Sequence, residues 1–453
     1  MKKAVITGIG IVSPFGLDAN GSGWNRWVRG LRAAESTTRT ISLFDATKPH
    51  AHYDSALKAS TLNASVHTSS TRTTSARSED APLSCRVAAE CRDFDAHLWT
   101  SEKDRDRVPR VVPLALAATD EALRAAGLSD LSDAQKRDVH VVMGSGGGGF
   151  SFAEEQFARW YGGDAKHLSP YAISSSIAGM VSSEISIAHG FRGRSHTISD
   201  GCTSSSDALG YALDMIRAGR AKTIVCGGAD ACVTPAMMAG FCLMRAVPTH
   251  WNDAPERASR PFSADRDGFV LGEGAWMFVV EESEHAQSRG AKVWAEIAGY
   301  GATCEAFHRV ALGEPDEAAR AMTMALEDAQ VLPSQIEYSN LHGTGTQLND
   351  PLETAAIKLA LGETAFKTPM SSTKSQIGHP QGASGAAGIA AAIAGMHGNF
   401  LPPTINLETP DEKCDLDYVA NHSRDYSFQT ALCNCLGFGS KNAAIVLKSD
   451  ARS

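Results

Sequence analysis

One cysteine, two histidines and one lysine stand in segments rich in glycine and hydroxyl residues. Cys202 lies within residues 199–206, His342 begins a His-Gly-Thr-Gly-Thr segment, and Lys374 and His379 lie within six residues of each other. A thiolate can hold an acyl group as a thioester. Imidazole and ammonium groups can stabilise the negative charge that develops when a second thioester loses carbon dioxide. The four residue types therefore indicate the joining of two thioesters through a carbon–carbon bond.

The surroundings of Cys202 favour a reactive thiol. A short strand is predicted just before it and a helix beginning near Thr203 just after it. The positive end of a helix dipole and its free N–H groups favour a thiolate, and the N–H of Cys202 can form half of an oxyanion hole. A buried structural cysteine is the alternative, and Cys202 alone does not decide between the two.

The histidines and the lysine are equally ambiguous when taken singly. His342 follows an apolar strand predicted over 336–341 and is framed by glycine and threonine, a typical way to present an imidazole to a pocket. His379 is flanked by glycine and proline, which indicates an unusual backbone. Lys374 would be a surface lysine in most proteins. The combination of these four residues indicates a catalytic site far more specifically than any one of them does.

Buried strands that alternate with helices must position these residues. The pattern predicts an α/β fold with parallel sheets, and from residue 294 it begins again, which suggests a duplicated fold with halves 1–290 and 291–453. Strands are predicted over 3–11, 139–143, 196–199, 222–227, 276–281, 336–341 and 442–447. Helices are predicted over 24–31, 108–126, 180–188, 207–218, 315–329, 351–361 and 385–395.

Composition excludes several classes of protein. The 453 residues carry a net charge of −9, which argues against a nucleic-acid binder, and no apolar run is long enough to span a bilayer. The ten cysteines lack the spacing of a zinc site, and free thiols with no signal peptide predict a cytoplasmic protein. Residues 55–82 are rich in serine and threonine and are predicted to be a mobile surface insertion, with partner docking as the less favoured alternative.

These segments resemble the β-ketoacyl-acyl-carrier-protein synthases, the condensing enzymes with a thiolase fold. The resemblance covers nearly the whole chain apart from the insertion, from residues 6–10 through 259–274 and 342–353 to Gly437-Phe438-Gly439. Within the family it is strongest to KAS-II-type enzymes and to ketosynthase-alpha subunits of bacterial aromatic polyketide systems. It implies a thiolase-like fold of two similar halves in five layers, αβαβα.

The resemblance also implies a role for each residue. Cys202 would accept the acyl chain from the phosphopantetheine of an acyl carrier protein. His342 and His379 would stabilise the enolate formed as malonyl-carrier protein loses carbon dioxide, and Lys374 would support the site together with Glu353. The N–H groups of Cys202 and Phe438 would form the oxyanion hole, with Phe438 also a gate. Asp350, Thr344 and Thr346 complete the supporting set. No metal or organic cofactor is implied.

Partners and substrate length follow from other positions. The resemblance implies a dimer, either of identical chains or with a chain-length-factor-like subunit, in which the strand before the nucleophile pairs across the interface. Gly147 stands where many relatives have a bulky residue, which predicts a longer or wider acyl pocket. Leu436 and Ser440-Lys441 also depart from the family pattern. Five basic residues are expected to dock the acidic carrier protein, namely Lys103, Arg105, Arg107, Arg110 and Arg245.

Two other functions compete with the condensing reaction. A thiolase shares the fold, and Cys433 lies four residues before Gly437, where a thiolase has a second catalytic cysteine. A thiolase has no use, however, for Lys374 and the His-Gly-Thr frame of His342. A non-catalytic chain-length-factor-like subunit would lack the nucleophile. The sequence therefore favours decarboxylative condensation in fatty acid or type II polyketide or polyene biosynthesis.

Overall fold

The computed structural model describes residues 1–47 and 82–449. The serine- and threonine-rich insertion predicted near 55–82 lies outside the described residues except for its last position. The helices are α1 (Gly23–Arg32), α3 (Val111–Ala126), α4 (Asp133–Lys136), α5 (Phe150–Tyr161), α6 (Met180–His189), α7 (Ser204–Arg217), α8 (Pro235–Met244), α9 (Ser283–Ser288), α10 (Asp316–Asp328), α11 (Asn349–Leu361), α12 (Lys374–Ile377) and α13 (Ser384–Gly398).

The strands alternate with these helices along the chain. They are β1 (Ala4–Val12), β2 (Arg39–Thr40), β3 (Val87–Ala89), β4 (Val139–Gly144), β5 (Ser195–Ile198), β6 (Thr223–Ala231), β7 (Leu271–Glu282), β8 (Ala295–Cys304), β9 (Tyr338–Asn340), β10 (Met370–Ser371), β11 (Phe400–Leu401), β12 (Arg424–Asp425), β13 (Thr430–Gly437) and β14 (Lys441–Lys448). The main path of hydrogen-bonded strands runs β10-β9-β13-β14-β8-β1-β7-β6-β4-β5.

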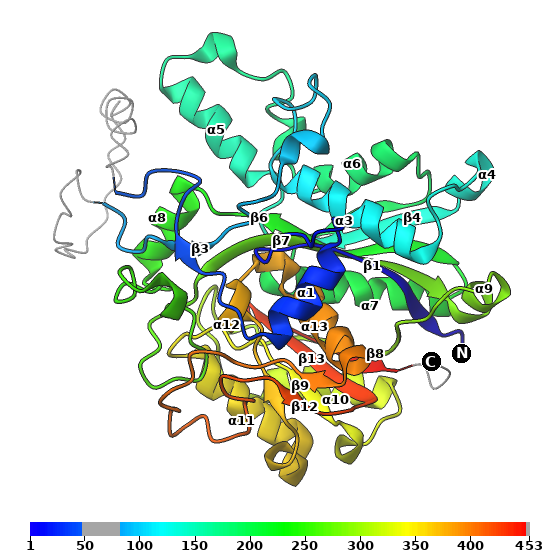
Figure 1. Cartoon of the computed structure of the whole chain (residues 1–453), viewed down its shortest axis with the longest axis vertical. Coiled ribbons are helices and arrows are strands. Elements are labelled where there is room, and N and C mark those ends of the chain that lie inside the picture. The colour runs from blue at the N-terminus through cyan, green and yellow to red at the C-terminus, as the bar shows by residue number, and fades with distance from the viewer. Residues whose placement is uncertain (48–81, 450–453) are drawn as a thin grey trace.

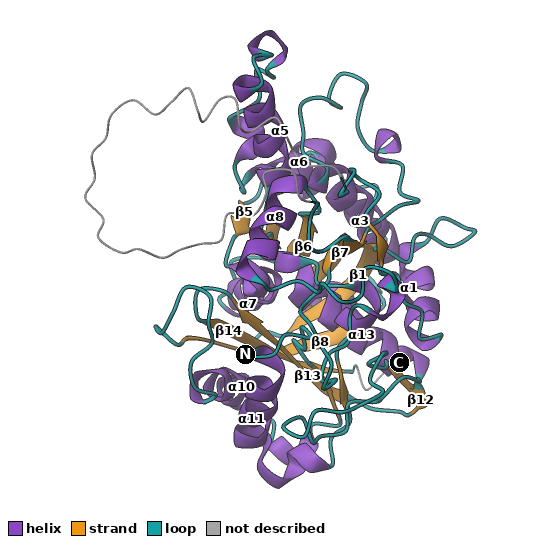
Figure 2. Ribbon diagram, turned by 90° about the vertical axis from the view of Figure 1, so that its left-hand side faces the viewer, coloured by secondary structure: helices purple, strands orange, loops and turns teal. Residues whose placement is uncertain are grey.

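The strands and helices form five layers, as a thiolase-like fold requires. Helices α3 and α6 cover the outer face of the strands from the first half, and α10 and α11 cover those from the second half (Figures 1 and 2). Helices α7 and α13 lie between and contact strands of both halves. The two sets of strands join because β1 pairs with both β7 and β8. The predicted fold class is confirmed.

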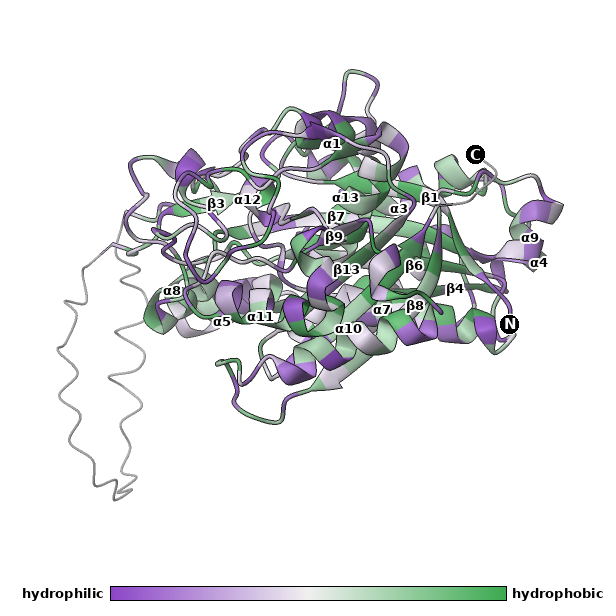
Figure 3. Cartoon of the chain, turned by 90° about the horizontal axis from the view of Figure 1, so that it is seen from below, coloured by the Kyte–Doolittle hydropathy of each residue, from purple (hydrophilic) through white to green (hydrophobic). Residues whose placement is uncertain are grey.

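The middle layer is buried enough to hold a rigid site. Helix α13 consists mainly of alanine and glycine, and its residues from Ser384 to Met396 are all buried. A helix that is apolar all round belongs in a protein core, and the colouring by hydropathy shows such a core along α13 and the central strands (Figure 3). Small side chains let the backbones approach closely: a Cβ on Gly10 of β1 would lie 1.9 Å from the carbonyl oxygen of Ala118 in α3.

The expectation of parallel sheets was only half right. Strands β4, β5 and β6 are parallel to one another, as are β9, β10 and β13. Strand β7 runs antiparallel to β1 and β6, and β14 runs antiparallel to β13 and β8. Only three residues separate Gly437 from its partner Lys441. A turn that short can join only antiparallel strands, and it places Phe438 at the tip of a hairpin.

Within the described ranges, the chain contains no helix long and apolar enough to cross a membrane.

Candidate active site

Cys202 occupies a tight turn between β5 and α7. The turn is a single 3-10 helical turn, Gly201–Thr203, and Gly201 has a φ of +66°, a conformation that glycine adopts without strain. The hydroxyl of Ser204 accepts a hydrogen bond from the N–H of Asp200 at 2.8 Å and donates one to the carbonyl of Gly201 at 2.6 Å. These bonds fix the buried side chain of Cys202 at the N-terminal end of α7, as the sequence predicted.

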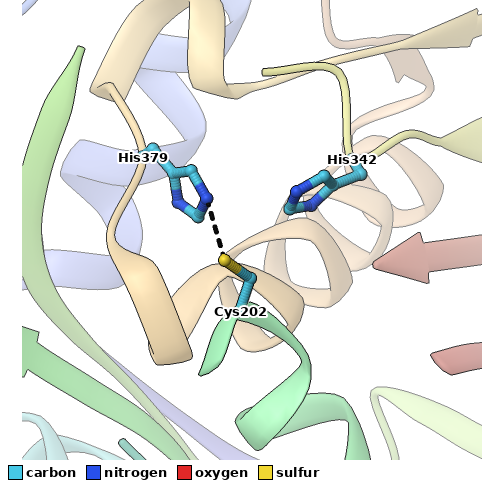
Figure 4. A group of neighbouring side chains, drawn as sticks. All are labelled: Cys202, His342 and His379. Carbon is cyan, nitrogen blue, oxygen red and sulfur yellow. Dashed lines mark hydrogen bonds between the residues drawn. The ribbon is translucent and has the colours of Figure 1, made fainter. Parts of the chain in front are cut away.

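His379 faces the sulfur of Cys202. Its Nε2 lies 3.2 Å from the Cys202 Sγ (Figure 4). The other ring nitrogen, Nδ1, accepts a hydrogen bond from the N–H of Gln381 at 3.1 Å and lies 2.9 Å from the Ser384 hydroxyl. Because a backbone N–H can only donate, the neutral ring carries its proton on Nε2. His379 therefore points an N–H donor at the nucleophile.

His342 approaches the same point from the other half of the fold. The two imidazole rings are 5.3 Å apart and nearly perpendicular, at 86°. The chain turns sharply after His342, and a Cβ on Gly343 would lie only 2.5 Å from the Cβ of Ser372. The N–H groups of His342 and Gly343 donate to the carboxylate of Glu353 at 2.6 and 2.7 Å. Glu353 thus holds the loop that carries His342.

Burial keeps both imidazoles neutral. It lowers the pKa of His342 and of His379 well below the usual value, and the nearby charge of Lys374 acts in the same direction. A neutral imidazole with its proton on the nitrogen that faces the substrate can donate a hydrogen bond to a carbonyl oxygen as that oxygen becomes negative. The pair is suited to stabilising an enolate.

The pKa of the Cys202 thiol is raised to about 11, chiefly by burial. The charge of Lys374 and the N–H groups of Phe438 and Cys202 lower it, but by less. In this buried site desolvation therefore outweighs the groups that favour the thiolate. The N–H groups of Phe438 and Cys202 are thus the two backbone donors that act on the sulfur.

Lys374 is buried at the start of the short helix α12. Burial lowers its pKa, whereas the carboxylates of Glu353 and Asp350 raise it. Burial raises the pKa of Glu353 to about 7. The lysine and the carboxyl each shift the pKa of the other, while the oxygens of Glu353 accept hydrogen bonds from N–H groups.

Asp350 supports the neighbouring loop. It accepts hydrogen bonds from the N–H groups of Phe262 at 2.7 Å and Gly345 at 3.1 Å. The guanidinium of Arg266 lies 3.7 Å from the same carboxylate. Asp350 thereby ties the His-Gly-Thr-Gly-Thr segment to the chain before β7.

A cavity of about 360 Å³ leads from the surface to the cysteine and the two histidines. Thr344 and Thr346 lie on its wall, and their hydroxyl oxygens are 3.0 Å apart. Arg245, His308 and Phe438 also line it. The cavity brings together residues that are far apart in the sequence and that the prediction had grouped.

Cys202, His342 and His379 also have atoms close enough to ligate one metal ion, within 4.8 Å of one another. A metal-bound histidine usually donates its other N–H to a carboxylate or carbonyl. The Nδ1 of His379 instead accepts an N–H, which leaves the proton on the nitrogen that would have to bind the metal. The hydrogen bonding fits a donor to substrate better than a ligand.

The predicted carrier-docking residues are not all available for docking. Lys103 and Arg105 are exposed, and Arg245 is exposed at the rim of the cavity. Arg107 is partly buried with its guanidinium 5.0 Å from the ring of Tyr171. These four remain candidates for docking.

Arg110 was wrongly assigned to the docking set. Its guanidinium donates two hydrogen bonds to the buried carboxylate of Glu273, at 2.7 and 2.9 Å, and a third to the carbonyl of Cys91. Its charge neutralises a carboxylate in the interior and is not presented to a partner. Arg110 therefore belongs to the structure of the first half.

Gly147 does not widen the cavity. A Cβ at this position would lie 2.2 Å from the sulfur of Cys232, so the side chain of Cys232 already occupies the space that a larger residue would take. Gly147 also donates its N–H to Asp230 at 2.9 Å. The additional pocket volume predicted at Gly147 is absent because the side chain of Cys232 fills that space.

Cys435 contacts the site although nothing in the sequence singles it out. Cys433, weighed as a thiolase-type cysteine, lies 4.0 Å from the carbonyl of Gly388 in α13, whereas Cys435 contacts both Cys202 and His342. Two residues along a strand share a face, so the spacing could not tell which cysteine reaches the site.

Comparison with known proteins shows the family to which the chain belongs. Residues 1–286 match the family model "Beta-ketoacyl synthase, N-terminal domain", and residues 294–408 match "Beta-ketoacyl synthase, C-terminal domain". The chain belongs to the β-ketoacyl synthase family.

Relatives from two kinds of pathway are about equally similar to it. The chain is 36% identical to 3-oxoacyl-[acyl-carrier-protein] synthase 2 of Coxiella burnetii, over 98% of each protein. It is 38% identical to putative polyketide beta-ketoacyl synthase 1 of Streptomyces halstedii, over 100% of this chain and 99% of the relative. The identities do not separate fatty acid from polyketide relatives.

Solved structures of ketosynthases are similar to this chain over nearly its whole length. A beta-ketoacyl synthase from Burkholderia phymatum superposes with a TM-score of 0.84 at 30% identity, covering 99% of this chain and 100% of that one. The ishigamide ketosynthase/chain length factor gives 0.82 at 29% identity, with coverages of 99% and 100%. A type II polyketide acyl-carrier protein in complex with its ketosynthase, bound to the hexaketide, gives 0.83 at 28%, with 99% of each chain covered.

Proposed function

We propose that this chain is a β-ketoacyl-acyl-carrier-protein synthase, which condenses malonyl-carrier protein with an acyl group held on Cys202 and releases carbon dioxide. The observation that carries this proposal is the contact between Cys202 and His379, at 3.2 Å, at the end of a cavity that also contains His342. One thiol and two neutral N–H donors around one point can hold one thioester and polarise another.

The first half-reaction loads the enzyme. The Cys202 sulfur attacks the thioester carbonyl of the acyl-carrier protein, the N–H groups of Cys202 and Phe438 stabilise the oxyanion, and the pantetheine thiol leaves with the proton of Cys202. The positive charge of Lys374 favours the thiolate needed for the attack. The product is an acyl-Cys202 thioester.

The second half-reaction forms the new bond. The bond between the malonyl carboxylate and its α-carbon breaks, carbon dioxide leaves, and the electron pair becomes an enolate whose oxygen accepts hydrogen bonds from His342 and His379. The α-carbon attacks the acyl-Cys202 carbonyl. Collapse of the tetrahedral intermediate expels the Cys202 thiolate and yields the β-ketoacyl-carrier protein.

The remaining assignments complete the proposal. The halves are residues 1–290 and 291–453, the carrier docks at Lys103, Arg105, Arg107 and Arg245, and Thr344 and Thr346 hold the pantetheine arm. The chain works in the cytoplasm without a metal or organic cofactor. It forms a dimer with itself or with a chain-length-factor-like subunit, the latter as in the ishigamide ketosynthase/chain length factor. Fatty acid, polyketide and polyene chains all remain candidate substrates.

The thiolase alternative is weaker because of where Lys374 and Cys433 lie. Lys374 is buried beside the reacting thiol, where a thiolase needs no lysine, and Cys433 contacts α13 instead of the cavity. A purely structural subunit would not need a nucleophile that faces two histidines.

Release of carbon dioxide tests the proposal directly. Malonyl-carrier protein labelled at the free carboxyl is incubated with the protein, with and without an acyl-carrier protein. We expect carbon dioxide release and a β-ketoacyl product. Cys202→Ala should lose condensation by at least about 10³-fold yet still release carbon dioxide, because both histidines remain. His379→Ala should lose both activities, and Cys433→Ala is the matched control. Acetyl-coenzyme A condensation without carbon dioxide release would overturn the proposal.

A further inference from the structure

We infer that Cys435 is a positioning residue that sets which nitrogen of His342 carries the proton. This inference rests on the proposed function, because it concerns the histidine that would stabilise the enolate. Cys435 lies on β13, three residues before the hairpin tip at Phe438, and its side chain is buried.

The thiol of Cys435 lies between a carbonyl oxygen, which can only accept a hydrogen bond, and a ring nitrogen that can accept or donate one according to its tautomer. Its sulfur is 3.1 Å from the carbonyl oxygen of Cys202 and 3.3 Å from the Nδ1 of His342. A thiol has one proton and can donate it to only one of them at a time. Cys435 therefore connects the backbone of the nucleophile with the ring of a histidine more than a hundred residues away in the sequence.

Comparison of the two histidines shows why this matters. Both rings are neutral in this buried site, so each carries its single proton on one nitrogen. In His379 the N–H of Gln381 and the hydroxyl of Ser384 approach Nδ1, and the backbone N–H fixes the proton on Nε2. At the Nδ1 of His342, the group that approaches is the Cys435 sulfur. When the thiol donates to Nδ1, His342 also has its proton on Nε2 and both rings can donate to one oxygen.

When the thiol donates to the Cys202 carbonyl instead, its sulfur can accept a hydrogen bond from an Nδ1–H of His342. The Nε2 of His342 is then an acceptor and repels the oxygen of an enolate. The orientation of one S–H bond thus decides whether His342 supports or opposes decarboxylation. We assign Cys435 the first orientation when malonyl thioester is bound.

Cys435 is not placed to act as a second nucleophile or base. Among the described residues, the cavity wall includes its neighbours Leu436 and Gly437, whereas the sulfur of Cys435 lies behind His342. Burial also raises the pKa of its thiol, so the proton stays on sulfur. The contacts fit a residue that acts through His342 and does not touch substrate.

The test compares Cys435→Ala and Cys435→Ser with Cys433→Ala, which removes a buried thiol from the same face of the same strand. The full-length protein is used, with malonyl-carrier protein as the substrate. We expect Cys435→Ala to lower the kcat for carbon dioxide release about tenfold with little change in KM, as loss of one positioning hydrogen bond would do. Cys435→Ser keeps a donor and should stay within about threefold of the parent, as should Cys433→Ala.

A spectroscopic measurement reports which ring nitrogen of His342 carries the proton. In protein with ¹⁵N-labelled histidine, the His342 signals are assigned by their loss in His342→Ala. We expect an Nε2–H ring in the parent and in Cys435→Ser, and a shift towards Nδ1–H in Cys435→Ala. An unchanged kcat and an unchanged ring in Cys435→Ala would overturn the inference while leaving the proposed function intact. Absence of carbon dioxide release from the parent would overturn the proposed function, and the ring signals would still report on Cys435.

Discussion

The hydroxyl of Ser440 donates a hydrogen bond to the carbonyl oxygen of His308 at 2.9 Å, and it accepts one from the N–H of the same residue at 3.1 Å. Two further bonds, from Glu305 to the Ser440 carbonyl and from Gly439 to the Arg309 carbonyl, join the same two loops. One loop carries Phe438 and the other carries His308, and both residues line the cavity. Four hydrogen bonds therefore join the two loops on this wall of the cavity.

Replacing Ser440 should weaken the contact between these two loops. Ser440 has a φ of +65°, which glycine adopts without strain. Ser440→Gly removes the hydroxyl and the strain together, whereas Ser440→Ala removes only the hydroxyl. We expect faster amide hydrogen exchange over residues 301–312 in both variants, and lower stability, by about 1 kcal/mol, for Ser440→Ala than for Ser440→Gly. Unchanged exchange in both variants would show that the hydroxyl does not hold the loops together.

The reactivity of Cys202 should rise steeply with pH. Because burial raises its pKa to about 11, the thiolate fraction, and with it the rate of alkylation by iodoacetamide, should increase about tenfold per pH unit between pH 7 and 10. Lys374→Gln removes a charge that lowers this pKa and should slow alkylation at each pH. Peptide mass spectrometry separates Cys202 from the exposed Cys304. A plateau below pH 9 would contradict this prediction.

Two arginines close together in the sequence should behave differently. Arg110→Ala leaves the Glu273 carboxylate buried without its partner, and we expect a loss of about 3 kcal/mol in the free energy of unfolding. Arg105→Ala changes an exposed side chain and should alter stability by less than about 0.5 kcal/mol, while weakening carrier binding at low salt. Denaturant unfolding and carrier titrations measure both quantities. Equal stability of the two variants would refute the assignment of Arg110.

Gly147 and Cys232 should be energetically coupled. Gly147→Ala places a methyl group where the sulfur of Cys232 lies, and such overpacking costs about 1–3 kcal/mol. Cys232→Ala removes the sulfur and should make the same change at Gly147 nearly neutral. A double-mutant cycle of unfolding free energies gives the coupling. Additive effects would mean that the two residues do not compete for one space.

Local patterns predicted the elements well and their pairing poorly. Strand β1 and helix α10 were placed to within about a residue because burial imposes periods of 2 and 3.6 on the sequence. The antiparallel pairing of β13 with β14 was not expected, because it depends on the three-residue turn around Phe438. Helices α5 and α8 were missed. Their exposed apolar residues, such as Trp160 and Leu243, obscure a simple one-sided pattern.

The catalytic residues could be predicted because their local segments are distinctive, but their neighbours could not. The pairing of Arg110 with Glu273 spans 163 residues. Cys435 contacts the site because of the register of its strand. In this register Cys433 pairs with Asn340 of β9 and Cys435 pairs with Ala443 of β14. Register is a property of the assembled sheet, and no single segment of the sequence contains it.

Strand β5 is the last strand of the main sheet path, and only three residues separate its end at Ile198 from Cys202. The outer edge of β5 offers backbone groups to another strand, and the turn that holds the nucleophile begins almost where the strand stops. A strand added to this edge would fix the backbone of β5 and so constrain the start of the turn that holds Cys202. The partner subunit and the reactivity of the Cys202 thiol would then be linked through this four-residue strand. Exchange of the partner would change that reactivity while every catalytic side chain stayed the same.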